Sequence, residues 1–271
     1  MSMHEFSGGR YFPIEIPILT ISPGKKLSIF YLEILRDRPG ILAEVAEEFS
    51  SRGMNIVHNL AHVEEGKGLI IIVAKRPDCV NIEELKGHLG SIEGIGSVEY
   101  EESHIEGLLI PYRLFPFLRG TVRLVALNTR AITSLSEELS KILGSSASGA
   151  ILFRIGYEMG KGFAEGHLKI AERVGIKDPF EILRHISVPL YASSGYGIAS
   201  LEEAGGVFSL RIRENFEAVD RESKEPSCYM TKGMWKGGLE SIFNRPISIE
   251  EVKCKAKGDE YCEFKIEIPR G

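Results

Sequence analysis

The sequence predicts an α+β protein of two domains, and three observations support this prediction. The chain has 271 residues, which is long for one compact domain and sufficient for two that each bury a core. Its first hundred residues switch repeatedly between strand and helix periodicity, and its end carries two segments of alternating apolar residues. Three cysteines cluster near that end, which predicts a stabilised hairpin in an antiparallel sheet.

The N-terminal domain is expected over residues 26–102, after an arm at 1–25 with one extended piece at 12–19. Aliphatic and aromatic runs predict its strands, and apolar residues at helical spacing predict its helices. The strands are expected at 27–35, 55–63, 69–74 and 97–101, and the helices at 41–52 and 82–89. The resulting order, βαββαβ, is that of the ferredoxin-like fold.

A proline-containing connector is expected at 103–124, and the C-terminal domain at 125–271. The same periodicity arguments predict an α/β domain with an antiparallel sheet. Helices are expected at 132–143, 150–164, 178–185 and 229–243, and strands at 195–199, 207–213, 252–256 and 261–268. Gly149, Gly156, Gly160 and Gly162 make the second helix intrinsically poor, which indicates close packing against another helix.

Composition excludes several classes of function. The net charge of -5 and pI of about 5.9 argue against nucleic-acid binding through phosphate neutralisation. No apolar stretch reaches membrane-spanning length, and the N-terminus lacks the layout of a signal peptide. A cytoplasmic protein without membrane contact is therefore expected. In a reducing compartment, clustered cysteines bind metal more often than they form disulfides.

The last hairpin is the clearest local feature of the sequence. Strand alternation places Cys254 and Cys262 on one apolar face, and a turn at 257–259 pairs them directly. Two thiolates at that spacing can share one tetrahedral ion. Buried cysteines without a ligand, or a reversible disulfide, are the alternatives.

Two further residues are candidate ligands near this hairpin. Cys228 precedes a predicted helix, whose N-terminus favours the thiolate form of the side chain. Glu251 lies three residues before Cys254, so strict alternation points it to the opposite face of the strand. Glu251 can join the cysteines only if the chain bends at that point.

Residues 205–268 resemble a 4-vinyl-reductase-type (4VR) domain, on a fold that covers about 125–271. The resemblance is carried by GYEMG at 156–160, ENF at 214–216, CYM at 228–230, GGLE at 237–240 and EVKCKAKGDEYCEF at 251–264. Sensor domains of this family, in bacterial activators that respond to phenols, hold zinc with three cysteines and one glutamate. The resemblance therefore implies a zinc site at Cys228, Glu251, Cys254 and Cys262, and it implies the bend at Glu251. A closed site of four protein ligands is structural rather than catalytic.

The segments DRPGIL at 37–42 and GMNI at 53–56 resemble the ACT domain, a regulatory unit that binds amino acids. Gly40 permits close backbone approach, and the helix that follows offers N–H groups to a carboxylate. Family members usually bind ligand between paired domains, which implies a homodimer. By that resemblance the ligand-facing residues are Asp37, Arg38, Gly40, Ile41 and Leu42, with Asn55 across the interface. The alternative is that the domain only dimerises.

His185 falls among apolar residues late in a predicted helix. It is expected either to be a hydrogen-bonded buried histidine or to offer a polar contact to a ligand in an apolar pocket. No catalytic residues are predicted, because the sequence has no nucleophile elbow and no dinucleotide-binding fingerprint.

These features predict a regulatory protein that senses small molecules and is not an enzyme. The N-terminal module is expected to bind an amino acid, and the zinc-containing C-terminal module a small hydrophobic or aromatic ligand. The resemblances indicate a prokaryotic or archaeal regulator of amino-acid or aromatic metabolism. A reductase-like enzyme and a non-catalytic assembly subunit, as in membrane-traffic complexes with a related fold, are the alternatives.

Overall fold

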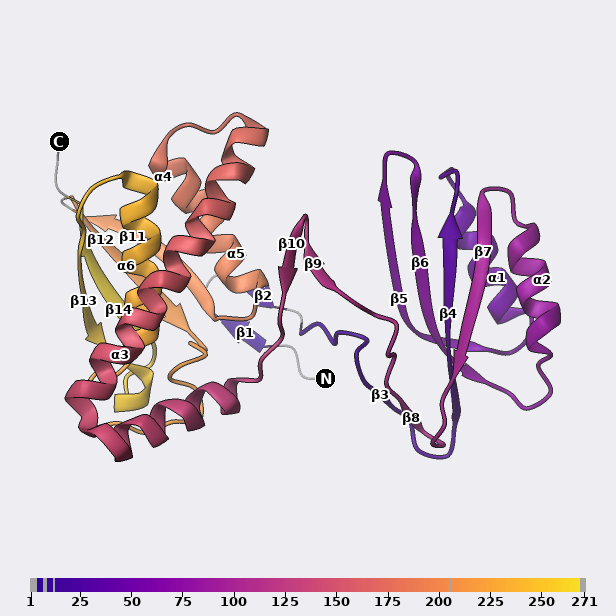
Figure 1. The fold of residues 1–271 in the computed structure, drawn as a ribbon, viewed down its shortest axis with the longest axis horizontal. Coiled ribbons are helices and arrows are strands. Elements are labelled where there is room, and N and C mark those ends of the chain that lie inside the picture. Colours follow the sequence, from indigo (N-terminus) through magenta and orange to yellow (C-terminus); the bar gives the residue numbers. More distant parts are fainter. Residues whose placement is uncertain (1–3, 7–8, 12, 205, 269–271) are drawn as a thin grey trace. The chain divides into compact units, whose positions relative to one another are not determined.

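The computed structural model describes residues 4–6, 9–11, 13–204 and 206–268. The chain divides into two compact units, the first ending at Phe117 and the second beginning at Leu118 (Figure 1). Each unit has its own sheet and its own hydrophobic core. The finer domain limits at 26–102, 103–124 and 125–271 stay predictions.

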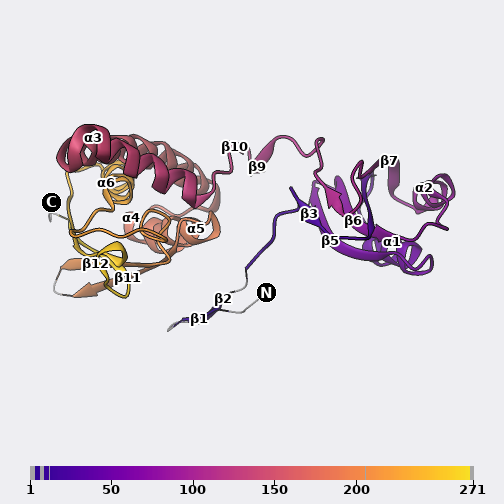
Figure 2. The same ribbon diagram turned by 90° about the horizontal axis from the view of Figure 1, so that it is seen from below.

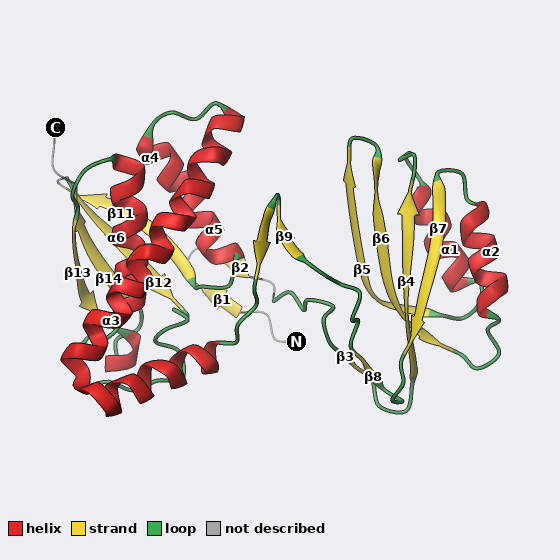
Figure 3. Ribbon diagram, in the orientation of Figure 1, coloured by secondary structure: helices red, strands yellow, loops and turns green. Residues whose placement is uncertain are grey.

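A four-stranded antiparallel sheet with two helices on one face forms the first unit (Figure 3). Its strands are β4 (Lys26–Ile34), β5 (Asn55–Glu64), β6 (Lys67–Arg76) and β7 (Ile95–Glu102), and its helices are α1 (Ile41–Ser50) and α2 (Ile82–Ser91). The strand order is β5-β6-β4-β7. This order confirms the ferredoxin-like βαββαβ fold.

Both faces of this sheet are buried at β4, because that strand is apolar at nearly every position. Phe30 lies on the side of the helices, whereas Leu27 points to the opposite side and packs with Leu109. Leu109 belongs to β8 (Leu108–Leu109), which pairs with β3 (Thr20–Ile21). Segments on both sides of the βαββαβ order thus complete the core of the unit.

The arm and the connector contain short strand pairs. In the arm, β1 (His4–Phe6) pairs with β2 (Gly9–Tyr11), and in the connector β9 (Phe117–Arg119) pairs with β10 (Val122–Leu124). The extended piece expected at 12–19 is not a strand at residues 13–19, because prolines 13 and 17 lack the N–H groups of a ladder. Residue 12 lies outside the described residues.

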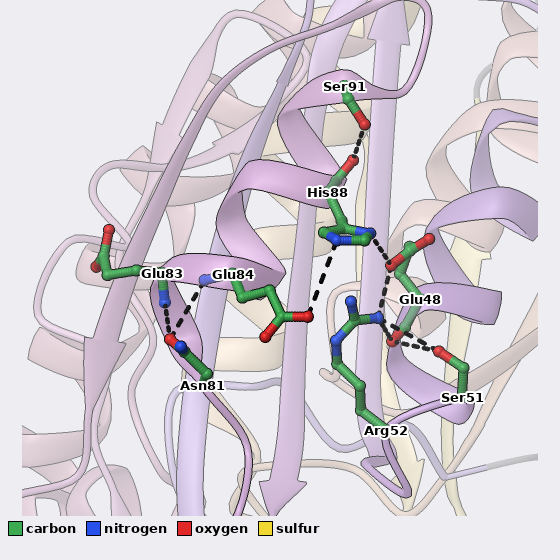
Figure 4. A network of polar contacts seen from close by, with 8 residues as sticks. All are labelled: Glu48, Ser51, Arg52, Asn81, Glu83, Glu84, His88 and Ser91. Carbon is green, nitrogen blue, oxygen red and sulfur yellow. Dashed lines mark hydrogen bonds and ion pairs between the residues drawn. The ribbon is translucent and has the colours of Figure 1, made fainter.

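The two helices of the first unit are linked by polar contacts on their solvent side (Figure 4). Asn81 begins α2 by accepting hydrogen bonds from the backbone N–H groups of Glu83 and Glu84. Across the helix pair, His88 Nδ1 lies 3.5 Å from Glu48 Oε2, and Arg52 Nη1 lies 2.6 Å from the same oxygen. Such exposed ion pairs contribute little to stability, so the helices are held mainly by their apolar sides.

The second unit is built around the contact between α3 (Thr129–Val174) and α6 (Tyr229–Phe243). Gly144 has φ 77° and ψ 160°, which kinks α3 into two helical segments, as the separate helices expected at 132–143 and 150–164 require. The second segment continues past the expected end and stops before Gly175, whose φ of 78° terminates the helix. Among the described residues, no helix combines the length and apolarity needed to cross a bilayer.

Glycines allow α3 and α6 to touch along their backbones. A Cβ atom at Gly156 would lie 2.0 Å from the carbonyl oxygen of Met230, and one at Gly160 would lie 1.9 Å from that of Met234. Reciprocally, a Cβ at a glycine of α6, Gly233 or Gly237, would lie 2.1 Å from a carbonyl oxygen of α3. The predicted close packing is thus confirmed for Gly156 and Gly160, whereas a Cβ at Gly162 would meet no atom within 4 Å.

The sheet of the second unit lies beneath α6, which lies beneath α3 (Figure 2). Its four antiparallel strands follow the order β11-β12-β14-β13. They are β11 (Ile198–Ala204), β12 (Val207–Arg213), β13 (Ser248–Lys253) and β14 (Cys262–Glu267). The prediction was correct for β12 and α6. It began β11 three residues too early, because Gly195 and Gly197 have positive φ and form a turn.

A broken helix connects α3 to the sheet. It consists of α4 (Pro179–Ile182), a single π turn η1 (Leu183–Ser187) and α5 (Val188–Ser193). Asp178 caps the first turn by accepting a hydrogen bond from the N–H of Phe180. The helix was expected to end near residue 185, but the π turn carries it on to Ser193.

Candidate metal centre and neighbouring side chains

The N-terminus of α6 brings Cys228 to the end of the last hairpin. Cys228 occupies the N-cap position of α6 and is fully buried. Its backbone N–H donates a hydrogen bond of 2.9 Å to Glu251 Oε2 in β13. The helix terminus and the sheet thus meet at this point.

The hairpin itself differs from the prediction. β13 ends at Lys253, and a register shift lies between Glu251 and Lys253. Cys254 therefore lies beyond the strand, and Cys262 pairs across the sheet with Ile212 of β12 instead. The direct pairing of Cys254 with Cys262 was wrong, because the bulge at residue 252 interrupts the alternation on which it rested.

A loop with its own hydrogen bonds positions Cys254. The carbonyl oxygen of Cys254 accepts hydrogen bonds from the N–H groups of Lys257 and Asp259, and its N–H donates to Asp259 Oδ2 at 2.9 Å. A short 3-10 helix, η2 (Lys255–Lys257), makes up the turn. The bulge also brings Glu251 to the cysteines, which is the bend that the resemblance implied.

Cys228, Glu251, Cys254 and Cys262 are positioned to hold a metal ion. One ligand atom from each residue lies within 4.8 Å of the others. Cys228 Sγ lies 3.5 Å from Cys254 Sγ and 3.6 Å from Cys262 Sγ, which is too far for a disulfide. Glu251 Oε1 is buried without a hydrogen-bond partner among the described residues, so its lone pairs are available to a cation.

The electrostatics of this cluster favour the binding of a cation. Burial, together with the charge of Cys254, raises the pKa of Glu251 to about 8. Hydrogen bonds to Cys254 and Cys262 raise the pKa of Cys228 well above its ordinary value, whereas the same kind of sulfur contact lowers the pKa of Cys254. On its own, the cluster therefore stabilises one negative charge, on Cys254. A divalent cation would stabilise the remaining thiolates and the carboxylate.

A polar network connects the cluster to the interior of the unit. Glu217 is fully buried and accepts hydrogen bonds from the N–H groups of Met230 and Thr231 in the first turn of α6. Burial raises the pKa of Glu217 to about 7. Asn215 Oδ1 accepts hydrogen bonds from Tyr191 Oη at 3.1 Å and from Thr231 Oγ1 at 3.2 Å.

An aromatic cluster lies on the other side of this network. The ring of Tyr191 lies 5.1 Å from Trp235 and 5.3 Å from Tyr196, which in turn lies 5.2 Å from Phe216 and 5.8 Å from Phe163. Two hydrogen-bond donors here, Trp235 Nε1 and Asn215 Nδ2, are buried without a partner in the described part of the chain. The sequence signalled the apolar side of α6 that carries Trp235, but it did not indicate an unpaired N–H.

His167 is a buried titratable group that sequence reasoning missed. Its Nδ1 lies 3.0 Å from the hydroxyl of Ser187, in the π turn. Burial first, and then the charge of Arg119, lowers the pKa of His167 to about 4. No local pattern could have indicated this contact, because its two residues lie in different helices.

His185 does not occupy the buried position that either interpretation required. Its side chain is 65% exposed and its Nε2 lies 3.0 Å from Glu181 Oε2. Ile182, Leu183 and Ile186 take the inward positions of the broken helix. The π turn changes the helical period at this point, so His185 points outward.

The loop before α1 places five of the predicted ligand residues together at one end of the first unit. Gly40 has φ 94° and starts α1 without a side-chain cap. Arg38 is held by a bidentate pair with Glu44 at 2.7 Å and by the carbonyl oxygen of Glu93. Ile41 is 4% exposed and belongs to the core, whereas Leu42 is 38% exposed.

Asn55 lies at the opposite end of the same sheet. It pairs with Lys75, whereas the N–H of Asp37 bonds to Gly66 in the β5–β6 turn. Within one chain, Asn55 and the Gly40 loop therefore do not meet. Their contact across a dimer interface stays a prediction.

Models of two domain families match the chain. The ACT domain matches residues 30–94, and the 4VR (vinyl-4-reductase) domain matches residues 208–268. The chain carries an ACT domain and a 4VR domain. The ACT match falls within the first unit, and the 4VR match contains all four residues of the candidate metal centre.

Individual proteins are similar to parts of the chain. An uncharacterized Methanocaldococcus jannaschii protein, MJ0745, is 26% identical over 170 residues, which cover 63% of this chain and 75% of that protein. The phenol-responsive sensory domain of the transcription activator PoxR has 21% identity and a TM-score of 0.47, covering 54% of this chain and 77% of that one. A vinyl-4-reductase family protein from Methanocaldococcus jannaschii has 19% identity and a TM-score of 0.38, covering 53% and 83%.

Proposed function

We propose that this protein is a regulatory protein that senses small molecules through both of its domains. The 4VR domain binds a small aromatic molecule beside a structural zinc site, and the ACT domain binds an amino acid at the Gly40 loop. The observation that carries the proposal is the pair of buried, unpaired donors, Trp235 Nε1 and Asn215 Nδ2, in the aromatic cluster of the described residues. Buried donors without acceptors are rare in proteins and need an explanation.

The metal of the 4VR domain is zinc in this proposal. Three sulfurs and one carboxylate are a zinc ligand set, and four protein ligands leave no open position for catalysis. Zn–S bonds of about 2.3 Å place sulfurs about 3.8 Å apart in a tetrahedron. The separations of 3.5 and 3.6 Å are close to that value. Zinc would join the N-terminus of α6 to the hairpin.

The aromatic cluster suits a planar ligand that carries a hydrogen-bond acceptor. Rings prefer offset or edge contacts with other rings, and the cluster offers several of them. A hydroxyl or carbonyl oxygen on the ligand would accept from Trp235 Nε1. Because Cys228 caps the helix that carries Trp235, the zinc site would keep the binding residues in place.

The Gly40 loop suits the carboxylate of an amino acid. The N-terminus of α1 has no side-chain cap, so its first N–H groups are available to an anion. A Cβ at Gly40 would lie 3.9 Å from Arg38, and the positive φ disfavours any other residue there.

The first test concerns zinc. Elemental analysis of the purified chain should give about one zinc per chain, because the four candidate ligands form a single closed set. Cys254→Ser should lose the metal. Cys79 is exposed and distant in sequence from the cluster, so Cys79→Ser is the matched control and should keep the metal. A wild-type chain that binds no zinc would contradict this part of the proposal.

The second test concerns the ligands. Single amino acids and simple phenols should each raise the melting temperature if they bind. Trp235→Phe keeps an aromatic ring but removes the N–H, so it should weaken phenol binding about tenfold, the value of one hydrogen bond, while amino-acid binding stays unchanged. No shift with any compound would count against sensing, and reproducible turnover with a reductant would favour the enzyme alternative.

A further inference from the structure

A cleft of about 430 Å³ opens at the end of the ACT-domain sheet opposite the Gly40 loop. Four separate segments line it, around the start of β4, the start of β5, the end of β6 and the segment after β7. The lining residues are Gly24, Lys25, Lys26, Gly53, Asn55, Lys75, Arg76, Pro77, Asp78 and Glu106. This volume lies in the range of small-molecule sites.

The walls of the cleft are positively charged, although the chain as a whole has a net charge of -5. Lysine and arginine side chains outnumber carboxylates among the lining residues. Charge of one sign concentrated in a concave surface raises the local concentration of the opposite ion. The cleft therefore favours an anionic ligand.

Two of the cations in the cleft are already paired. Lys26 Nζ lies 2.7 Å from Asp78 Oδ1, and Arg76 forms an ion pair with Glu102. Lys25 and Lys75 have no carboxylate partner anywhere in the described part of the chain. Their two charges are thus the ones available to a ligand, and Asn55 lies opposite Lys75 in the sheet.

Two glycines leave room beside these lysines. Gly24 and Gly53 have φ values of 68° and 67°. A Cβ at Gly24 would meet no atom within 4 Å, and one at Gly53 would meet only Pro77 Cγ at 4.0 Å. Both turns therefore keep the mouth of the cleft clear of side chains.

An unpaired donor lies in the wall that Arg76 forms. The Nε atom of Arg76 is buried without a hydrogen-bond partner among the described residues, although its guanidinium also forms the ion pair with Glu102. Arg76 is opposite Lys26 in the sheet, at the edge of the cleft. A bound anion, or the water that accompanies it, accounts for such a donor better than apolar packing does.

We propose that this cleft binds a small phosphate monoester, through Lys25 and Lys75 with Asn55 beside them. Lysine binds phosphate as a point charge, and two unpaired lysines match the double charge of a phosphate monoester. The volume accommodates the phosphate and a small organic group. A nucleic-acid strand does not fit, because Asp78 and Glu106 flank the cleft and would repel a continuous phosphate backbone.

This site is distinct from the proposed amino-acid site, since it lies at the other end of the sheet. Its occupation would tie together four chain segments that are far apart in the sequence. The ACT domain would thus respond to two chemically different ligands.

The test uses the full-length, metal-loaded chain. Inorganic phosphate and glycerol 3-phosphate are titrated by calorimetry in chloride buffers of equal ionic strength, with succinate as a dianion that lacks phosphate. Saturable binding of both phosphates at millimolar concentrations is expected, with little binding of succinate. Lys25→Gln combined with Lys75→Gln should weaken binding at least tenfold.

The matched control is Lys86→Gln, on α2, where the lysine pairs with Glu83. It removes the same charge at a distance from the cleft and should leave the affinity unchanged. Equal affinity in the double variant, no saturable phosphate binding, or equal binding of succinate would each overturn the proposal. Circular dichroism of the double variant shows whether it is folded, and Asn55→Ala, at an exposed position, gives a second, independent variant of the same site.

Discussion

The two domains hold their acidic and basic groups in opposite ways. In the 4VR domain, three cysteines and one glutamate converge in a buried cluster, with like charges that only a cation can balance. In the ACT domain, Lys25 and Lys75 line an open cleft without a carboxylate partner among the described residues. A buried cluster of fixed ligands suits a permanent structural ion, whereas exposed charges suit a ligand that exchanges. The comparison separates the part of the molecule that is stapled from the part that responds.

Breaking the cluster should have the largest effect. Cys254→Ser removes one ligand from the buried site and should destabilise the 4VR domain by several kcal/mol, or about 10 °C in melting temperature. The single tryptophan, Trp235, lies in that domain, so its fluorescence reports 4VR unfolding alone. Coincident loss of the ACT domain by circular dichroism would contradict the separation of the two domains.

The contact between α3 and α6 should come next. Gly160→Ala places a Cβ 1.9 Å from the carbonyl oxygen of Met234, which forces the helices apart and should cost about 3 kcal/mol of unfolding free energy. Gly162→Ala is the matched control in the same helix. It meets no atom within 4 Å and should be neutral or stabilise the helix by up to about 1 kcal/mol. Urea unfolding of both variants measures the difference, and equal stabilities would disprove the backbone contact.

A smaller effect is expected from His167, and it should depend on pH. The pKa of His167 in the folded chain is about 4, below the ordinary value of 6.5, so the unfolded chain binds the proton more readily between these values. Stability should therefore fall by about 2–3 kcal/mol as pH drops from 6.5 to 4. His167→Gln can keep the contact with Ser187 without titrating. Melting curves should show a shallower pH dependence for the variant, and identical profiles would contradict the assignment.

The smallest effect belongs to the exposed loop of the ACT domain. Glu44→Gln removes the ion pair with Arg38, and both side chains are partly exposed to solvent. Exposed pairs contribute little, so the melting temperature should not change measurably. A large decrease would show that this loop is held as firmly as the metal centre, which would remove the contrast between the domains.

The sequence predicted most elements whose ends carry strong local signals. Tyr229–Phe243 was placed correctly, because a cysteine and a proline precede it and an asparagine in the left-handed region follows it. The βαββαβ order was readable because each helix and strand has its own hydrophobic period. The two segments of α3 were also separable, because Gly144 lies between two helical patterns.

The errors arose where a backbone irregularity changed the period. The bulge after Glu251 moved Cys254 out of the strand, and the π turn moved His185 to the surface. Alternation and helical spacing assume a regular backbone, so neither could reveal these shifts. The four metal-ligand candidates were brought together as a group only because the family resemblance supplied the bend. His167 and the unpaired donor of Trp235 depend on contacts between distant segments, which one sequence does not display.

The glycine contact between α3 and α6 has a consequence for how a signal could leave the 4VR domain. With no side chains between them, the two helix backbones cannot slide past each other without collision. α6 is also tied to the hairpin through Cys228 and Glu251. A displacement of α6 must therefore carry the second half of α3 with it as one rigid body, and Gly144 is the hinge at which that body can turn relative to the first half of α3.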